Sequence, residues 1–296
     1  MEHQLNTRRR FVVTIAALAT LTTLITACSE PVVIGSSEDT IDGQVTTTSS
    51  QAQAASTTPP TTNSVSSEKI IWTPCLNAPA GESECGELAV PFDYDNPTVG
   101  SFTLFLTRLP ATDSANKIGS MLVNPGGPGF GGSSVARDAE YYFSSELLDR
   151  FDIIGWDPRG TGKSTPAVNC IDEYDEYFGI DSTPETPEEK QTIIELSQKF
   201  NDECVKRSGE ILPYISTQAT ARDMDSIRQA LGEEKITYFG FSYGSELGAT
   251  WATMFPNTVR AAVLDGASDP NATSLDQGLA QARGFEKQLD AFLAAC

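Results

Sequence analysis

The chain has 296 residues, enough for one large domain or two small ones with a buried core. Acidic residues outnumber basic ones by 40 to 20, which argues against a nucleic acid as partner, because phosphate binding requires a basic surface. The only histidine is His3 and the cysteines are widely spaced, so we expect no Cys/His metal cluster.

Residues 1–27 are typical of a signal peptide. Three arginines at 8–10 precede an apolar run over 11–27, in which several threonines make a permanent transmembrane helix the weaker interpretation. The run ends in Leu-Ile-Thr-Ala-Cys28, which is similar to a bacterial lipobox and predicts lipidation of Cys28. Two or more acyl chains would hold the protein on the outer face of the membrane. The alternative is an ordinary signal peptide cut near Ala27, which would leave the protein secreted.

Residues 28–68 are rich in Ser, Thr, Gln, Ala and Pro. So few apolar residues cannot offset the entropy lost on ordering, which predicts a disordered tether. The character of the sequence then changes. We expect a folded core over residues 69–268 and the start of a further helix over 269–296.

Cysteines on an exported chain favour disulfides. With the lipidated cysteine set aside, proximity in the sequence favours the pairs Cys75–Cys85 and Cys170–Cys204 and leaves Cys296 as the odd one. Because the chain then stops within a helix at an odd cysteine, we expect it to be the amino-terminal part of a longer protein.

Apolar and β-branched runs predict strands, and a 3.6-residue period predicts helices. The expected strands are 88–94, 100–109, 118–123, 151–156, 236–239 and 259–265, and the expected helices include 219–231, 246–255 and 275–296. Strands that alternate with helices indicate an α/β fold with a mostly parallel sheet.

A further helix is predicted to begin at Thr186, where Thr, Pro and Glu are spaced as in a capping box. Its apolar residues Ile193, Leu196 and Phe200 share a face with Cys204. We expect this face to pack inward and to bring Cys204 to Cys170.

The sequence Gly-Phe-Ser-Tyr-Gly over residues 240–244 lies between an expected strand and an expected helix. That order is typical of a nucleophile elbow, in which a serine at a sharp turn exposes its hydroxyl. The glycines are needed because side chains there would collide with the strand and the helix. A plain Gly-Ser loop is the alternative. We interpret Ser242 as a nucleophile.

A serine that attacks a carbonyl needs N–H donors for the oxyanion, a base and an orienting acid. One donor is the backbone N–H of Tyr243, the residue after the nucleophile. We expect the second from the glycine-rich loop over residues 124–132, for which a plain surface turn is the alternative.

Residues 160–164 read Gly-Thr-Gly-Lys-Ser, but a nucleotide-binding P-loop would require glycine in place of Asp157. We therefore expect no nucleotide, and we interpret Asp157 and Arg159 as an ion pair that braces this loop. Without a histidine after His3, no Ser-His-Asp triad can form within the exported chain. Lys163 is an unsupported candidate base, and we interpret Asp265 as structural.

Three motifs together suggest a family: Asn-Pro-Gly-Gly-Pro-Gly from Asn124, Trp-Asp-Pro-Arg-Gly-Thr-Gly-Lys-Ser from Trp156, and Gly-Phe-Ser-Tyr-Gly-Ser from Gly240. From about Trp72 to Cys296 the chain resembles the exported bacterial tripeptidyl-aminopeptidase-like branch of the α/β-hydrolases, which is related to the proline iminopeptidases.

The resemblance implies an α/β-hydrolase fold, with Ser242 as nucleophile and Gly127 and Tyr243 as oxyanion donors. It also implies a cap inserted after Asp265, a partner for Cys296 a few residues beyond the chain, and a triad Asp and His further on. The sequence departs from the family by ending in the first helix of the cap.

The expected function is that of an exported serine peptidase, which releases short peptides from free amino termini through an acyl-Ser242 intermediate without a cofactor. The triad histidine is missing from this chain, so we expect the chain to be inactive alone. An esterase or lipase of the same fold is one alternative. A non-catalytic surface lipoprotein is the other.

Overall fold

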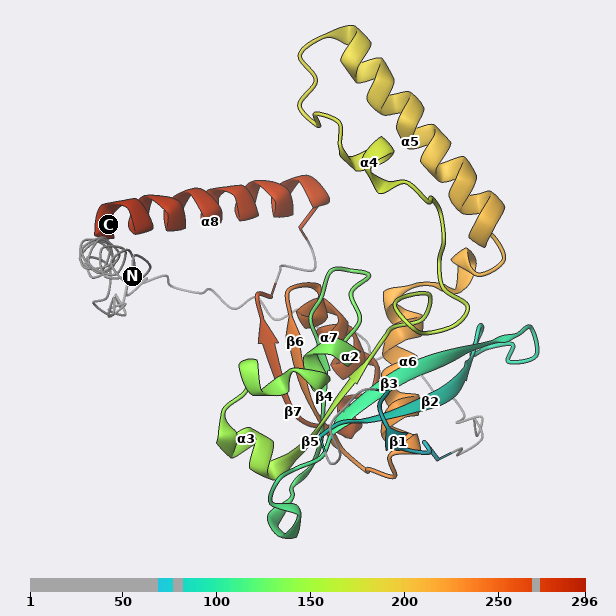
Figure 1. Ribbon diagram of the computed structural model, residues 1–296, viewed down its shortest axis with the longest axis vertical. Helices are drawn as coiled ribbons and strands as arrows, with labels where there is room; N and C mark the ends of the chain where they lie inside the picture. The colour runs from blue at the N-terminus through green and yellow to red at the C-terminus, as the bar shows by residue number, and fades with distance from the viewer. Residues whose placement is uncertain (1–68, 77–81, 268–271) are drawn as a thin grey trace, which may run out of the picture. The chain divides into compact units, whose positions relative to one another are not determined.

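The computed structural model describes residues 69–76, 82–267 and 272–296 (Figure 1). The predicted signal peptide, the lipidation site at Cys28 and the tether lie outside these residues. The described residues fall into two compact units, one within residues 69–267 and one over residues 272–296. Each is described separately.

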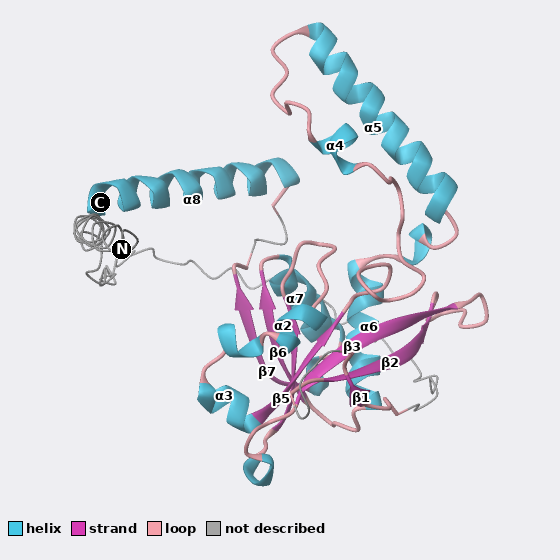
Figure 2. Ribbon diagram, in the orientation of Figure 1, coloured by secondary structure: helices cyan, strands magenta, loops and turns pink. Residues whose placement is uncertain are grey.

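The first unit is built on a seven-stranded sheet (Figure 2). The strands, in the spatial order β1-β2-β3-β5-β4-β6-β7, are β1 Thr73–Pro74, β2 Glu84–Pro91, β3 Ser101–Leu109, β5 Phe151–Trp156, β4 Gly119–Asn124, β6 Ile236–Phe241 and β7 Val259–Asp265. The pairs β5–β4, β4–β6 and β6–β7 are parallel. The pairs β1–β2, β2–β3 and β3–β5 are antiparallel. The predicted α/β fold with a mostly parallel sheet is confirmed in the half that carries the elbow.

Helices cover both faces of the sheet. These are α2 Ser133–Arg137 and α3 Ser145–Arg150 on one face, and α6 Thr217–Ala230 and α7 Tyr243–Met254 on the other. Two further helices, α4 Tyr174–Phe178 and α5 Pro187–Ser208, pack against each other. Short 3-10 turns lie between the elements. Neighbouring residues of β4, such as Leu122 and Val123, fall into two different apolar clusters because successive side chains of a strand point to opposite faces. One cluster includes Met224 of α6 and Trp251 of α7, and the other includes residues of α2.

The central strands are apolar on both faces, as expected where helices cover both sides of a parallel sheet. Leu122, Val123 and Ile154 have no exposed surface. These strands are predictable from the sequence because their apolar runs are uninterrupted. The helices α2 and α3 were not predicted, because they are too short to show a helical period, and neither was the two-residue strand β1.

Both expected disulfides are present, Cys75–Cys85 and Cys170–Cys204. The capping box at α5 is also confirmed: the hydroxyl of Thr186 accepts the N–H of Glu189, whose carboxylate accepts the N–H of Thr186. None of the described helices is both long and apolar enough to cross a membrane.

The prediction that the apolar face of α5 packs inward is wrong. Ser208 is the only buried residue of this helix. Its apolar face instead lines a cavity of about 400 Å³ together with Tyr177 and Phe178 of α4. The ring of Phe200 lies 5.9 Å from that of Tyr177 and 6.1 Å from that of Phe178. The chain that leads into α5 thus covers this face, so the helix needs no contact with the core there.

The second unit contains α8, Ser274–Ala295, which begins where the hydroxyl of Thr273 accepts the N–H of Asp276. The predicted helix is therefore present. Its apolar residues, among them Phe285 and Phe292, are exposed in the structure. Its assignment as the start of a cap stays a prediction.

Candidate active site

Ser242 lies at the turn between β6 and α7 with an exposed side chain and a strained backbone. Its φ is +52° and its ψ is −125°, and among the described residues no other non-glycine residue has a positive φ. Such a conformation costs about 1–3 kcal/mol and persists only where the surroundings hold it. The strain is what a nucleophile elbow requires.

Main-chain hydrogen bonds hold the turn on both sides. The N–H of Ser242 donates to the carbonyl oxygen of Asp265, at the end of β7, over 2.7 Å. The carbonyl oxygen of Ser242 accepts two hydrogen bonds from Ser245, one from its N–H at 2.8 Å and one from the Ser245 hydroxyl at 2.5 Å. Asp265 thus contributes its main chain to the site, which supports its interpretation as a structural residue.

The two glycines of the motif are required by space. A Cβ at Gly240 would lie 2.2 Å from the carbonyl oxygen of Gly244, and one at Gly244 would lie 2.6 Å from the carbonyl oxygen of Asn124. The buried phenol of Tyr238 also donates to the carbonyl of Gly244 at 2.7 Å and fixes the first turn of α7.

The glycine-rich loop after β4 reaches the elbow through Gly126, which has a φ of +97°. A Cβ on Gly126 would lie 2.5 Å from the carbonyl oxygen of Phe241 and 2.9 Å from the nitrogen of Tyr243. The N–H of Gly126 is bound to the side-chain oxygen of Asn124 at 2.9 Å. The sequence motif indicates Gly127 as a donor, but it does not indicate that Gly126 is the residue of the loop closest to the elbow. The repeated glycines were the only signal for it.

Tyr243 is the first residue of α7, so its N–H has no acceptor within the helix and lies at the positive end of the helix dipole. Gly127, with a φ of +115°, follows Gly126 directly. The loop and the helix start that were predicted to supply the two oxyanion donors are therefore adjacent. Burial raises the pKa of the Tyr243 phenol, whose hydroxyl is hydrogen-bonded to that of Thr217 at 2.7 Å.

The predicted ion pair between Asp157 and Arg159 is wrong, because the two side chains bind different partners. One carboxylate oxygen of Asp157 accepts the N–H of Ser133, at the start of α2, and the other accepts the N–H of Lys163. Glycines at 131 and 162 leave room for this carboxylate, since a Cβ on either would lie within 2.3 Å of it. Asp157 therefore ties the end of the glycine-rich loop to the loop after β5.

Arg159 is buried and donates to both carboxylate oxygens of Asp223 on α6, at 2.8 and 2.6 Å. The same guanidinium donates to the carbonyls of Pro91, Phe92 and Tyr214. Burial lowers the pKa of Arg159, but the hydrogen bonds and charge of Asp223 outweigh it and raise the pKa above its ordinary value. Arg159 therefore braces the loop after β5, as expected, but its carboxylate partner is Asp223 on α6 and not Asp157.

Lys163 is poorly placed to act as the base. Its ammonium group lies 4.6 Å from the centre of the Phe105 ring on β3. Ser242 follows β6, which is three strands from β3 in the sheet, or about 14 Å at the usual spacing. Lys163 was the only base predicted within the chain.

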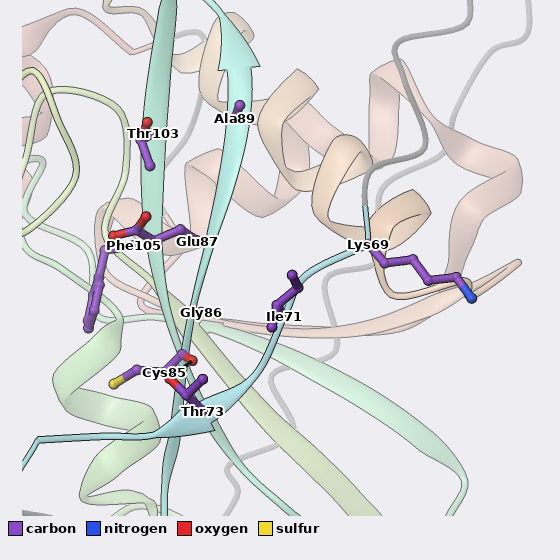
Figure 3. Close-up of a pocket in the computed structure, with 9 residues that line it drawn as sticks. All are labelled: Lys69, Ile71, Thr73, Cys85, Gly86, Glu87, Ala89, Thr103 and Phe105. Carbon is purple, nitrogen blue, oxygen red and sulfur yellow. Dashed lines mark hydrogen bonds between the residues drawn. The ribbon is translucent and has the colours of Figure 1, made fainter.

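A cavity of about 500 Å³ lies on the outer strands β2 and β3 (Figure 3). Figure 3 shows it lined by Lys69, Cys85, Glu87 and Phe105, among others. The strands β5 and β4 separate these residues from β6. This cavity therefore lies apart from Ser242, the candidate nucleophile.

Taken with the sheet order, this geometry defines the class of protein. The chain belongs to the α/β-hydrolase fold family, whose sequence model matches residues 119–296. All three motifs that suggested this family lie within that match.

The chain is also similar to individual curated proteins, which indicate its branch within this family. The chain is 38% identical over 238 residues to Serine protease Hip1 of Mycobacterium tuberculosis, covering 77% of this chain and 45% of that protein. It is 37% identical over 210 residues to Tripeptidyl aminopeptidase of Streptomyces lividans, covering 67% and 38%. It is 38% identical over 234 residues to Carboxylesterase B of M. tuberculosis, covering 76% and 45%. These relatives confirm the resemblance to the tripeptidyl-aminopeptidase-like branch, and the chain spans less than half of their length.

Proposed function

We propose that this chain is the amino-terminal part of an exported serine peptidase that releases short peptides from free amino termini. Ser242 is the nucleophile, and the N–H groups of Gly127 and Tyr243 bind the oxyanion. The observation that carries the proposal is the strained backbone of Ser242 beside the glycine-rich loop. The names of two relatives, serine protease and tripeptidyl aminopeptidase, support the reaction class.

In this mechanism the hydroxyl oxygen of Ser242 forms a bond to the carbonyl carbon of the scissile amide, and its proton passes to a base. The negative charge that develops on the carbonyl oxygen is stabilised by the two N–H groups, each of which contributes about 10²–10³ in rate. The base returns the proton to the leaving amine as the amide bond breaks. A water molecule then hydrolyses the acyl-enzyme and regenerates the serine.

The base and its orienting acid are proposed to come from sequence that follows residue 296. In α/β-hydrolases these partners follow the nucleophile along the chain. The chain has no histidine after His3, and it covers only 45% of Serine protease Hip1. We therefore expect residues 1–296 alone to lack the activity of the whole protein.

Export is supported by the two disulfides, which persist in oxidising compartments outside the cytosol. Anchoring through acyl chains on Cys28 is part of the proposal. Incorporation of radiolabelled palmitate, lost in Cys28→Ala, would test it.

An esterase is the second candidate, because the elbow and the oxyanion donors serve esters and amides alike. The similarity to Carboxylesterase B favours it specifically. The two functions differ in the leaving group and in the need for a free amino terminus. The third candidate is a protein that has the fold but no catalytic activity, and the experiments below distinguish it from the two enzymes.

The first test is labelling of the full-length protein with a fluorophosphonate probe. We expect labelling that disappears in Ser242→Ala and persists in Ser134→Ala, a control serine that is exposed on α2. Folded protein that is not labelled would overturn the catalytic assignment.

The second test compares tripeptidyl p-nitroanilides with p-nitrophenyl esters, each with a free and an acetylated amino terminus. A peptidase of free amino termini should lose about tenfold or more in kcat/KM on acetylation, since a hydrogen bond to a charged group contributes about 1.5–3 kcal/mol. Hydrolysis of esters alone, indifferent to acetylation, would favour the esterase.

A further inference from the structure

Three aromatic residues lie on or against the segments that meet at the candidate nucleophile, and we call Phe130, Tyr142 and Phe241 the aromatic wall. Phe130 is 67% exposed and Tyr142 is 54% exposed. Large apolar side chains are usually withdrawn from water, and a group of exposed ones commonly marks a binding surface. Contact with a substrate requires in addition that these rings be firmly held and lie next to Ser242.

Phe241 and Tyr142 are held against the core beneath them. Phe241 is the residue immediately before Ser242, and its ring centre lies 6.1 Å from that of Tyr142. The Phe241 ring also lies 4.7 Å from that of Phe239, which contacts the buried Phe143 at 5.3 Å. Rings supported in this way can bind a ligand with little loss of side-chain entropy.

Phe130 belongs to the glycine-rich loop and lies against the proposed oxyanion donor. A Cβ on Gly127 would be 3.1 Å from Cδ2 of the Phe130 ring. The neighbouring Gly126 is in contact with the main chain of Phe241 and Tyr243. Phe130 thus adjoins Gly127 and Phe241 adjoins Ser242, the two residues between which an attacked carbonyl group is proposed to sit.

We propose that the aromatic wall binds the side chain of the residue whose carbonyl is attacked, and that it selects a large apolar or aromatic side chain there. This inference rests on the proposed function of Ser242. In the acyl-enzyme the carbonyl carbon is bonded to the serine oxygen, and its oxygen points to Gly127 and Tyr243. The side chain of the acyl residue branches from the Cα atom bonded to this carbonyl carbon, and in this arrangement it extends toward Phe130 and Phe241. Aromatic rings favour apolar and aromatic partners through burial and edge-to-face contact.

The test measures binding rather than turnover, so that it does not depend on the catalytic step. The full-length protein with Ser242→Ala is titrated calorimetrically with the amides of Ala-Ala-Phe and Ala-Ala-Ala. Phe130→Ala and Tyr142→Ala are then introduced singly. Each should weaken binding of the phenylalanine peptide about tenfold and leave binding of the alanine peptide unchanged, as expected for an apolar contact in a specificity pocket.

Tyr141→Ala is the matched control. Tyr141 is the neighbour of Tyr142 and is 83% exposed, so its removal should change neither affinity. Tyr142→Phe keeps the ring and should bind both peptides as the parent does. Thermal unfolding of every variant checks that each protein is folded.

The inference is overturned if the parent binds both peptides equally, or if the variants weaken both equally. It is also overturned if the variants lose thermal stability while the preference for phenylalanine is kept, because the rings would then only pack against protein. If the wild-type protein is labelled by fluorophosphonate but shows no preference for phenylalanine, the proposed role of the aromatic wall is refuted and the assignment of Ser242 as nucleophile is not. Absence of labelling refutes the proposed function itself.

Discussion

Replacing Gly126 with alanine would place a methyl group 2.5 Å from the carbonyl oxygen of Phe241 and 2.9 Å from the nitrogen of Tyr243. Both are backbone atoms, so neither can rotate away. The φ of +97° adds a second penalty, since an L-residue in a left-handed conformation costs about 1–2 kcal/mol. Overpacking costs about 1–3 kcal/mol more. We expect the free energy of unfolding to fall by about 2–5 kcal/mol in total.

Gly129 provides a control within the same loop. Its φ is +103°, close to that of Gly126, but a Cβ there would meet nothing within 4 Å. Gly129→Ala should therefore lose only the conformational part, about 1–2 kcal/mol. The difference between the two variants isolates the contact between the loop and the elbow.

Equilibrium unfolding in urea, with the disulfides intact, measures both losses. The slopes of the transitions should agree among the three proteins, so that the midpoints report stability. In the full-length protein, Gly126→Ala should also slow fluorophosphonate labelling more than Gly129→Ala does. Equal losses of stability for the two variants would refute the idea that Gly126 is packed against the elbow.

Two further predictions concern the framework of the site. Arg159→Ala leaves the carboxylate of Asp223 buried without its partner and should lower the free energy of unfolding, measured in urea, by about 3–5 kcal/mol. The control is Arg137→Ala, which breaks an exposed ion pair with Asp138 and should lower the free energy of unfolding by less than about 1 kcal/mol. A loss below about 1 kcal/mol at Arg159 would contradict the structure. The disulfides close loops with sequence separations of 34 and 10, so replacing Cys170 and Cys204 with serine should destabilise by about 1 kcal/mol more than replacing Cys75 and Cys85. The reverse order in thermal unfolding would argue against the loop-entropy account.

The strands and the elbow could be predicted because their signals are local. The apolar runs of β4, β5 and β6, and a serine between two glycines before a helix, are visible within a dozen residues. The capping box at Thr186 is local too. In each case the residues that decide the structure are neighbours in the sequence.

The errors come from contacts between distant residues. Arg159 binds Asp223, which is 64 positions away, whereas the nearby Asp157 binds main-chain N–H groups instead. Periodicity showed that α5 has an apolar face, but it could not show that α4 would cover it. The closest approach at Gly126 depends on how the loop after β4 meets the elbow, and no pattern within the loop indicates it.

The backbone of Ser242 has a consequence for how this position changes over evolution. Glycine adopts a positive φ without the steric cost that serine bears there, so Ser242→Gly should relieve strain in the folded protein. Random substitution in the absence of any demand on the hydroxyl would therefore drift toward glycine. The proposed nucleophile would thus gain its exposed hydroxyl at a cost in stability.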